Sequence, residues 1–184
     1  MFMNWVRQGR LQLPEEEIEA QMFDETIEAM DKKGRHQYEV SNFALTGKES
    51  QHNLAYWNND HYYGFGAGAS GYLGQTRYKN HGPIQHYLKP LRENQLPIVE
   101  TEELTRLNQI EEELFLGLRK KVGISKQKFQ QKFHEPIEAI YGEVIQRLIK
   151  EELLIEEADI LRLTKKGLFV GNNVFEAFLL SEKE

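Results

Sequence analysis

The stretch that decides the fold reads GAGASGYLGQTRY, residues 66–78, and its glycines admit two interpretations. Its first six residues match the dinucleotide-binding pattern G-x-G-x-x-G. That pattern holds a pyrophosphate only where the glycines lead directly into a helix N-terminus. Here residues 72–78 alternate like a strand and a turn, so the sequence predicts no nucleotide site. We expect instead a tight crossing of the backbone, which can also line the pocket of a flat ligand.

The composition limits the class of protein. Of 184 residues, 40% are hydrophobic and 28% are charged, as in ordinary soluble globular proteins. The apolar runs are too short to span a bilayer and the first residues lack a secretory core, so we expect a cytoplasmic protein. The net charge of −6 argues against non-specific nucleic-acid binding. Because the chain has no cysteine, it cannot itself supply thiolates to zinc or to an iron–sulfur cluster.

The N-terminal part has the pattern of half a βαβ unit. Residues 14–34 predict an amphipathic helix, since Pro14 and three acidic residues begin it and Gly34 ends it. Residues 36–43 alternate polar with apolar or aromatic side chains, which predicts a strand. No strand precedes Pro14, so the chain looks as if it begins midway through an α/β fold.

From about residue 83 the pattern becomes mainly helical. A short helix over residues 83–93 and an extended connector over 96–99 are expected first. Thr101 is expected to cap the next helix, whose buried stripe comprises Leu104, Leu107, Ile110, Leu114, Phe115 and Leu118. The remaining elements form a winged-helix pattern: helices from Ser125 and Pro136, a hairpin at residues 153–155 and 160–163, and a helix capped by Thr164.

The winged-helix pattern raises the alternative of a DNA-binding module. Its recognition helix would be residues 136–150, which balances two glutamates against Arg147 and Lys150. Residues 101–184 carry 13 Lys and Arg against 16 Asp and Glu, a net charge of −3. We therefore expect this helix to pack on a neighbour rather than enter a groove.

The segment HNLAYW, residues 52–57, is the main candidate for a ligand site. If it is helical, His52 and Tyr56 lie on one face at positions i and i+4. A neutral imidazole can ligate haem iron, and the rings of Tyr56 and Trp57 can cover a planar porphyrin. Spacing alone leaves a second interpretation open, in which His52 and Trp57 only pack and hydrogen-bond within a folded turn.

Other constellations give no comparable signal. His81 and His86 are five residues apart and lack the spacing and carboxylates of a zinc site. Asp60 and His61 have no partner serine in a nucleophile elbow, so a hydrolytic triad has no support.

Three ordered motifs resemble one known family. They are YEVSNFA at residues 38–44, HNLAYW at 52–57 and GFGAGA at 64–69. Together they resemble the radical SAM family of oxygen-independent coproporphyrinogen III oxidase-like proteins. The H-N-x-x-Y-W motif is similar to that of the HemW branch, whose members are regarded as haem chaperones, and a true oxidase is the alternative. The resemblance extends further, through residues 77–80, 113–119 and 163–172.

The resemblance implies that this chain is the C-terminal half of a longer α/β protein. Residues 1–82 would be the late part of a partial (β/α) barrel, with strands near Tyr38 and Phe65. Residues 83–100 would be a connector, and residues 101–184 a mostly helical, winged-helix-like domain. The cysteines for a [4Fe–4S] cluster and most S-adenosylmethionine contacts would lie in the missing half, so no radical chemistry is expected from this chain alone. Exposed barrel surface would favour self-association of the fragment.

The resemblance also implies site residues. The H-N-x-x-Y-W motif implies haem binding by His52, Asn53, Tyr56 and Trp57, with His52 as the iron ligand. The glycine-rich segment implies a pocket wall formed by Gly66, Gly68 and Ser70. Many relatives carry histidine where this sequence has Ser70, so no second imidazole is expected there. The implied partners are haem or a porphyrin and the missing barrel half, without nucleic acid, and no catalytic residue is assigned.

Overall fold

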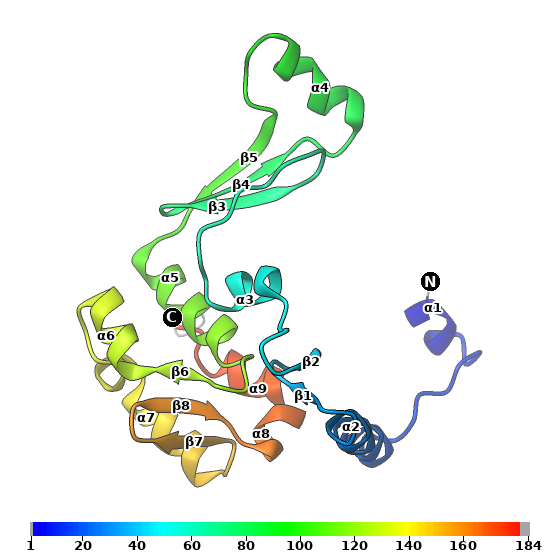
Figure 1. The fold of residues 1–184 in the computed structure, drawn as a ribbon, viewed down its shortest axis with the longest axis vertical. Helices are drawn as coiled ribbons and strands as arrows, with labels where there is room; N and C mark the ends of the chain where they lie inside the picture. Colours follow the sequence, from blue (N-terminus) through cyan, green and yellow to red (C-terminus); the bar gives the residue numbers. More distant parts are fainter. Residues whose placement is uncertain (1, 181–184) are drawn as a thin grey trace. The chain divides into compact units, whose positions relative to one another are not determined.

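The computed structural model describes residues 2–180 of the chain. Their contacts divide them into two compact units, with the boundary between Glu49 and Ser50 (Figure 1). The mixed α/β class is confirmed, with small antiparallel sheets among the described residues. The predicted division of the chain into residues 1–82, 83–100 and 101–184 stays a prediction.

The first unit consists of helices followed by a β-hairpin. α1 spans Phe2–Arg7 and α2 spans Glu16–Asp31, as the helical pattern predicts for α2. Gly34 follows α2 with a φ of +69°, a left-handed conformation that ends a helix at little steric cost.

The strand predicted over residues 36–43 is wrong, because the stretch folds back on itself. β1, Arg35–Gln37, pairs antiparallel with β2, Phe43–Leu45. Glu39 accepts hydrogen bonds from the backbone nitrogen of Ser41 at 3.0 Å and the side-chain amide of Asn42 at 2.6 Å. These local bonds close a turn where alternation alone predicted extended chain.

The second unit opens with α3, Gln51–Trp57, and continues into a sheet ordered β3-β4-β5. Neighbouring strands are antiparallel. The segment that connects β4 to β5 contains α4, Ile84–Arg92. The strand bounds are Ser70–Leu73, Thr76–Asn80 and Ile98–Glu103. The strand and turn expected after the glycines are therefore confirmed. The strand expected near Phe65 is wrong, since residues 63–69 form a loop whose backbone bonds to side chains of other segments.

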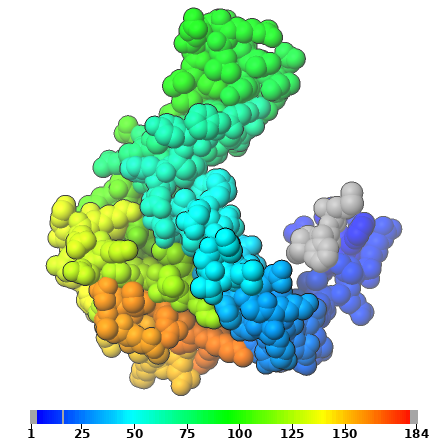
Figure 2. Space-filling view, viewed as in Figure 1, coloured from blue at the N-terminus to red at the C-terminus, as the bar shows by residue number. Residues whose placement is uncertain are grey.

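The rest of the second unit has the predicted winged-helix order. Its elements are α5 (Arg106–Gly117), β6 (Ile124–Ser125), α6 (Lys126–Phe133), α7 (Ile137–Lys150), β7 (Leu154–Glu157), β8 (Ile160–Leu163), α8 (Lys165–Phe169) and α9 (Gly171–Glu176). β8 lies between β6 and β7 and is antiparallel to both. Thr164 caps α8 as predicted, but the final helix is interrupted at Val170. Figure 2 shows these elements in yellow-green to red, and the β3–β5 segment with α4 in teal to green.

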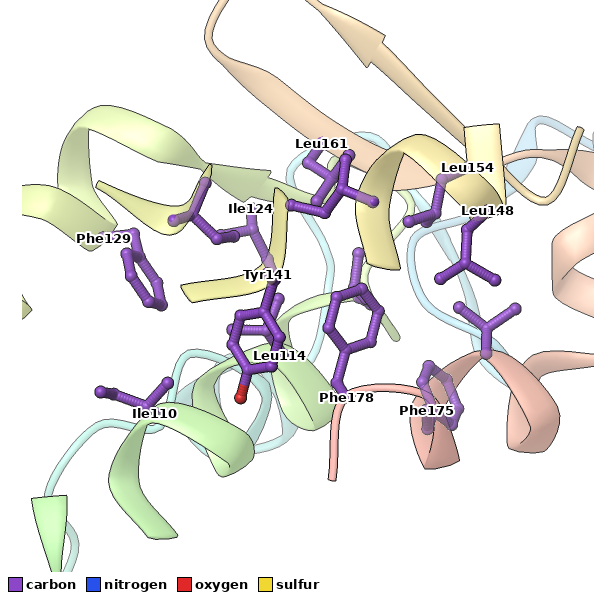
Figure 3. Close-up of a cluster of buried hydrophobic side chains, with 14 of the residues drawn as sticks. Ile110, Leu114, Ile124, Phe129, Tyr141, Leu148, Leu154, Leu161, Phe175 and Phe178 are labelled. Atoms are coloured by element: carbon purple, nitrogen blue, oxygen red, sulfur yellow. The ribbon is translucent and has the colours of Figure 1, made fainter. Parts of the chain in front are cut away.

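The hydrophobic core lies in the winged-helix domain (Figure 3). Leu114 of α5, Tyr141 of α7 and Leu161 of β8 are at most 1% exposed. The predicted α5 stripe is wrong at two positions, since Leu107 and Phe115 are 38% and 41% exposed. Leu107 lies in the first turn of the helix. Phe115 lies at the edge of the stripe, where its ring meets the ring of Phe175 at a centroid distance of 5.2 Å.

The residue that caps α5 also differs from the prediction. Thr101 lies within β5, paired with Tyr78, so its predicted capping role is wrong. Thr105 caps α5 instead, in a reciprocal arrangement with Asn108. Among the described residues, no helix combines the length and the apolar character needed to cross a bilayer.

Candidate functional site

α3 displays the HNLAYW motif as a short capped helix. The hydroxyl of Ser50 accepts a hydrogen bond from the backbone nitrogen of Asn53 at 3.3 Å, which satisfies one free amide of the first turn. His52 and Tyr56 lie on one face, and their rings meet edge to face at a centroid distance of 4.8 Å. The predicted pairing of these two side chains is confirmed. His52 itself is exposed to solvent.

A series of aromatic contacts links this face of α3 to β3. The ring of Tyr56 meets the ring of Tyr62 at 4.6 Å. Tyr62 then forms an isolated antiparallel bridge with Tyr72, with both backbone N···O distances at 2.9 Å. Burial raises the pKa of Tyr62, and the nearby Arg77 opposes that shift. Sequence reasoning missed Tyr62, because its role depends on contacts with Tyr56 and Tyr72, which only the folded chain brings together.

The glycine loop is held by side chains from outside it. The amide nitrogen of Asn80 donates to the carbonyl oxygens of Gly64 at 3.1 Å and Gly66 at 3.0 Å. The backbone nitrogen of Gly64 donates to the hydroxyl of Tyr78 at 2.9 Å, and that of Gly66 donates to the hydroxyl of Tyr87 at 3.3 Å. These bonds require a close approach of backbone and side chains, as expected from the glycine content. The loop leads into a strand rather than a helix, and it therefore lacks the phosphate-binding geometry of a dinucleotide loop.

Ser70 lines a small hollow of about 180 Å³ on the β3–β5 sheet. The other lining residues are Tyr62, Gly71, Arg77, Tyr78, Lys79, Glu100 and Glu102. Arg77 also pairs with Glu112 of α5 at 2.7 Å, and its guanidinium lies 5.5 Å from the centroid of the Tyr72 ring. Burial raises the pKa of the Glu112 carboxyl, while Arg77 acts in the opposite direction. Charged side chains of both signs line the hollow, beside two tyrosine rings.

The proposed site residues thus fall into separate groups. His52 and Tyr56 share one face of α3, and Ser70 lies in the hollow with Tyr62, which also contacts Tyr56. Gly66 and Gly68 are not among the residues that line this hollow. Trp57 is directed to the winged-helix domain, where the guanidinium of Arg119 lies 4.7 Å from its ring centroid.

The remaining histidines do not form a metal site of the usual kind. Within the described residues, no group of three or more His, Cys, Asp or Glu side chains is placed to hold a metal ion. The rings of His81 and His86 lie 6.0 Å apart. His61 Nε2 lies 3.1 Å from the carbonyl oxygen of Gly74, and its ring packs on Tyr72.

Comparison with known proteins finds relatives of this chain. Residues 104–170 match the HemN C-terminal domain. The heme chaperone HemW of Lactococcus lactis is 49% identical over 99% of this chain and 48% of its own length. The heme chaperone HemW of Bacillus subtilis is 45% identical over 97% of this chain and 47% of its own length. The chain therefore spans about half the length of these curated relatives.

A solved structure has a similar fold. The coproporphyrinogen III oxidase HemN of Escherichia coli, described as a radical SAM enzyme, matches with a TM-score of 0.70 and 17% identity. The match covers 92% of this chain and 42% of that one, and at this identity it supports the fold alone.

The fold and the matches define a class of protein, an α/β chain whose winged-helix region is a HemN C-terminal domain. The family resemblance carried by the motifs is thereby confirmed. The chain matches relatives named heme chaperone HemW along nearly its whole length and about half of theirs.

Proposed function

We propose that this chain is the C-terminal part of a haem-binding protein of the chaperone type, with His52 as an axial ligand of the haem iron. The observation that carries the proposal is the exposed imidazole of His52 on the capped helix α3, backed by the Tyr56 ring at 4.8 Å. An accessible neutral imidazole is a suitable ligand for haem iron, and an aromatic neighbour suits a porphyrin edge. The relatives named heme chaperone HemW, at 45% and 49% identity, support the haem-binding part of the proposal.

The other proposed site residues have supporting roles. Asn53 contributes through its backbone to the cap of α3, and Tyr56 gives apolar cover beside the ligand. Gly66, Gly68 and Ser70 belong to the glycine-rich wall that we propose faces the porphyrin in the complete protein. Large exposed side chains such as Phe65, 84% exposed, and Leu96, 75% exposed, support contact with a further segment or a second copy. A cytoplasmic location is part of the proposal.

This chain does not have the donors for an iron–sulfur cluster. It contains no cysteine, whereas such clusters are held by cysteine thiolates. Cluster and S-adenosylmethionine binding are therefore proposed for the complete protein only, with cluster ligands supplied from outside these residues. The oxidase alternative rests on a structural likeness at 17% identity, which favours it less than the haem-chaperone proposal.

Titration of ferric haem into the chain tests this proposal. We expect a Soret band that saturates with the wild type and with His61→Ala, and an affinity reduced about tenfold or more in His52→Ala. A tenfold loss corresponds to about 1.4 kcal/mol, a modest value for one iron–nitrogen bond. His61 is the matched control, because it is close in the chain and its ring already contacts Tyr72. Equal affinities in the three proteins would contradict the proposal.

A further inference from the structure

α3 is too short to be stable without anchors outside the helix. It has seven residues, and all of them are described, yet none of its side chains is fully buried. Isolated helices shorter than about 12 residues are marginal in water. The position of His52 therefore depends on whatever fixes α3 to the rest of the second unit.

One anchor of α3 is Arg119, which follows α5 and lies among three aromatic rings. The guanidinium of Arg119 lies 4.7 Å from the ring centroid of Trp57, 5.9 Å from that of Phe115 and 5.8 Å from that of Phe175. A guanidinium over an aromatic face is attracted by the ring quadrupole, more strongly where water is excluded. Among the described residues, Trp57 Nε1 is buried without a hydrogen-bond acceptor, so the indole is held by its face rather than by its N–H group.

The next residue gives a second, independent contact to the same end of α3. Lys120 Nζ donates a hydrogen bond to Asn58 Oδ1 at 2.7 Å, and Asn58 is the C-cap of α3. Burial lowers the pKa of Lys120, while Glu113 and Asp60 act against that shift. Cations at the C-terminal ends of helices are favoured by the partial negative charge there, and α3 and α5 both end at this point.

We propose that Arg119 is a positioning residue for His52. By holding Trp57, it fixes the last turn of α3 on the winged-helix domain and so sets the direction of the imidazole one turn earlier. This gives Trp57 the role of an anchor rather than a cover for the ligand. It also means that the winged-helix domain helps to position α3, the helix that carries the HNLAYW motif. The haem-dependent part of this inference rests on the proposed function, and the anchoring part does not.

Fluorescence tests the anchor without haem. The chain has two tryptophans, Trp5 and Trp57, so a Trp5→Phe background leaves Trp57 as the only reporter. In that background we expect Arg119→Met to raise acrylamide quenching of Trp57 about twofold. Arg119→Lys should restore much of the protection, because it keeps a cation over the ring. Arg147→Met, an exposed arginine on α7, is the control and should leave quenching unchanged.

Haem titration of the same variants tests the coupling to His52. We expect Arg119→Met to bind about tenfold more weakly than the parent while its saturated Soret band keeps the same position, because the imidazole is still present. Unchanged quenching in Arg119→Met, with circular dichroism like the parent, would overturn the anchor. Altered quenching with unchanged haem affinity would overturn the coupling. If the parent binds no haem while quenching still changes, the proposed function fails and the anchor stands.

Discussion

At the scale of single residues, the glycine-rich stretch is explained by what touches its backbone. A Cβ at Gly71 would overlap the ring of Tyr78, which lies across from it in the β3–β4 pair. The Tyr78 hydroxyl also accepts the hydrogen bond from Gly64, so its ring cannot move freely. The glycine is needed for close packing, independently of any ligand.

This packing gives a stability prediction. Gly71→Ala should lower the free energy of unfolding by about 1–3 kcal/mol, the usual cost of inserting atoms into a filled space. Urea denaturation measures the change. Gly82→Ala is the control, since a Cβ there meets no atom within 4 Å, and it should be close to neutral. An unchanged free energy of unfolding in Gly71→Ala would contradict this prediction, because it would mean that the Tyr78 ring moves aside at little cost.

At this scale the sequence predicted only part of the site. The other contacts were missed because they join residues that are far apart along the chain. The pairing of His52 and Tyr56 follows from a four-residue helical spacing, which local sequence contains. The contact of Trp57 with Arg119 joins residues 62 positions apart, and no periodicity encodes it. Tyr62 was missed for the same reason, because its contacts depend on how α3 meets β3.

At the scale of secondary-structure elements, the start of α5 shows that strand pairing can override a local helix-capping signal. Thr101 followed by two glutamates is a good local cap, but Glu102 pairs with Arg77 and Glu103 with Thr76 in the β4–β5 ladder. The strand therefore continues and the helix begins later. Thr105 Oγ1 accepts from Asn108 N at 3.2 Å, and Asn108 Oδ1 accepts from Thr105 N at 3.1 Å.

The two threonines give a direct comparison. Thr105→Ala should lower the free energy of unfolding by about 1 kcal/mol, the typical cost of losing a helix cap. Thr101→Ala changes an exposed strand position and should cost about 0.5 kcal/mol or less. Denaturant midpoints of the two variants measure the difference. A larger loss in Thr101→Ala would contradict the observed start of α5.

Asp159 connects the β7–β8 turn to the start of α6 and makes that connection dependent on pH. The hydroxyl of Ser125 donates to its carboxylate, as does Gln127 N at 2.8 Å. These hydrogen bonds, with that of Ser125 the larger influence, lower the pKa of Asp159. A carboxyl group with a depressed folded pKa stabilises the fold above its unfolded pKa, and this contribution is lost as pH falls through the folded value.

Asp159→Asn should therefore lower the melting temperature at neutral pH. The difference from the wild type should shrink as pH falls below about 4, near the ordinary aspartate value. Thermal melts across that range measure it, with Glu143→Gln on the exposed side of α7 as the control. A difference that stays constant with pH would contradict the assigned role of the carboxylate.

At the scale of the whole molecule, the winged helix predicted from the sequence is present, and its charges oppose a DNA-binding role. Lys126 of α6 is paired with Glu138 of α7 at 2.8 Å, and it also contacts Glu156 of β7. Residues 101–184 carry a net charge of −3. We expect weak binding of labelled duplex DNA with little dependence on salt. Tight binding with a steep salt slope in a fluorescence titration would contradict this, since only a phosphate-tracking surface produces one.

The central claim concerns the ligand on α3, and the absorption spectrum of the ferric-haem complex tests it most directly. We expect the Soret band of His52→Ala to differ in position from that of the wild type, because the iron–nitrogen bond is lost. Free imidazole should then restore the wild-type spectrum in His52→Ala, since it replaces the missing ring, and should leave the His61→Ala spectrum unchanged. Identical spectra for the wild type and His52→Ala, with no response to imidazole, would contradict the assignment of His52 as the haem ligand.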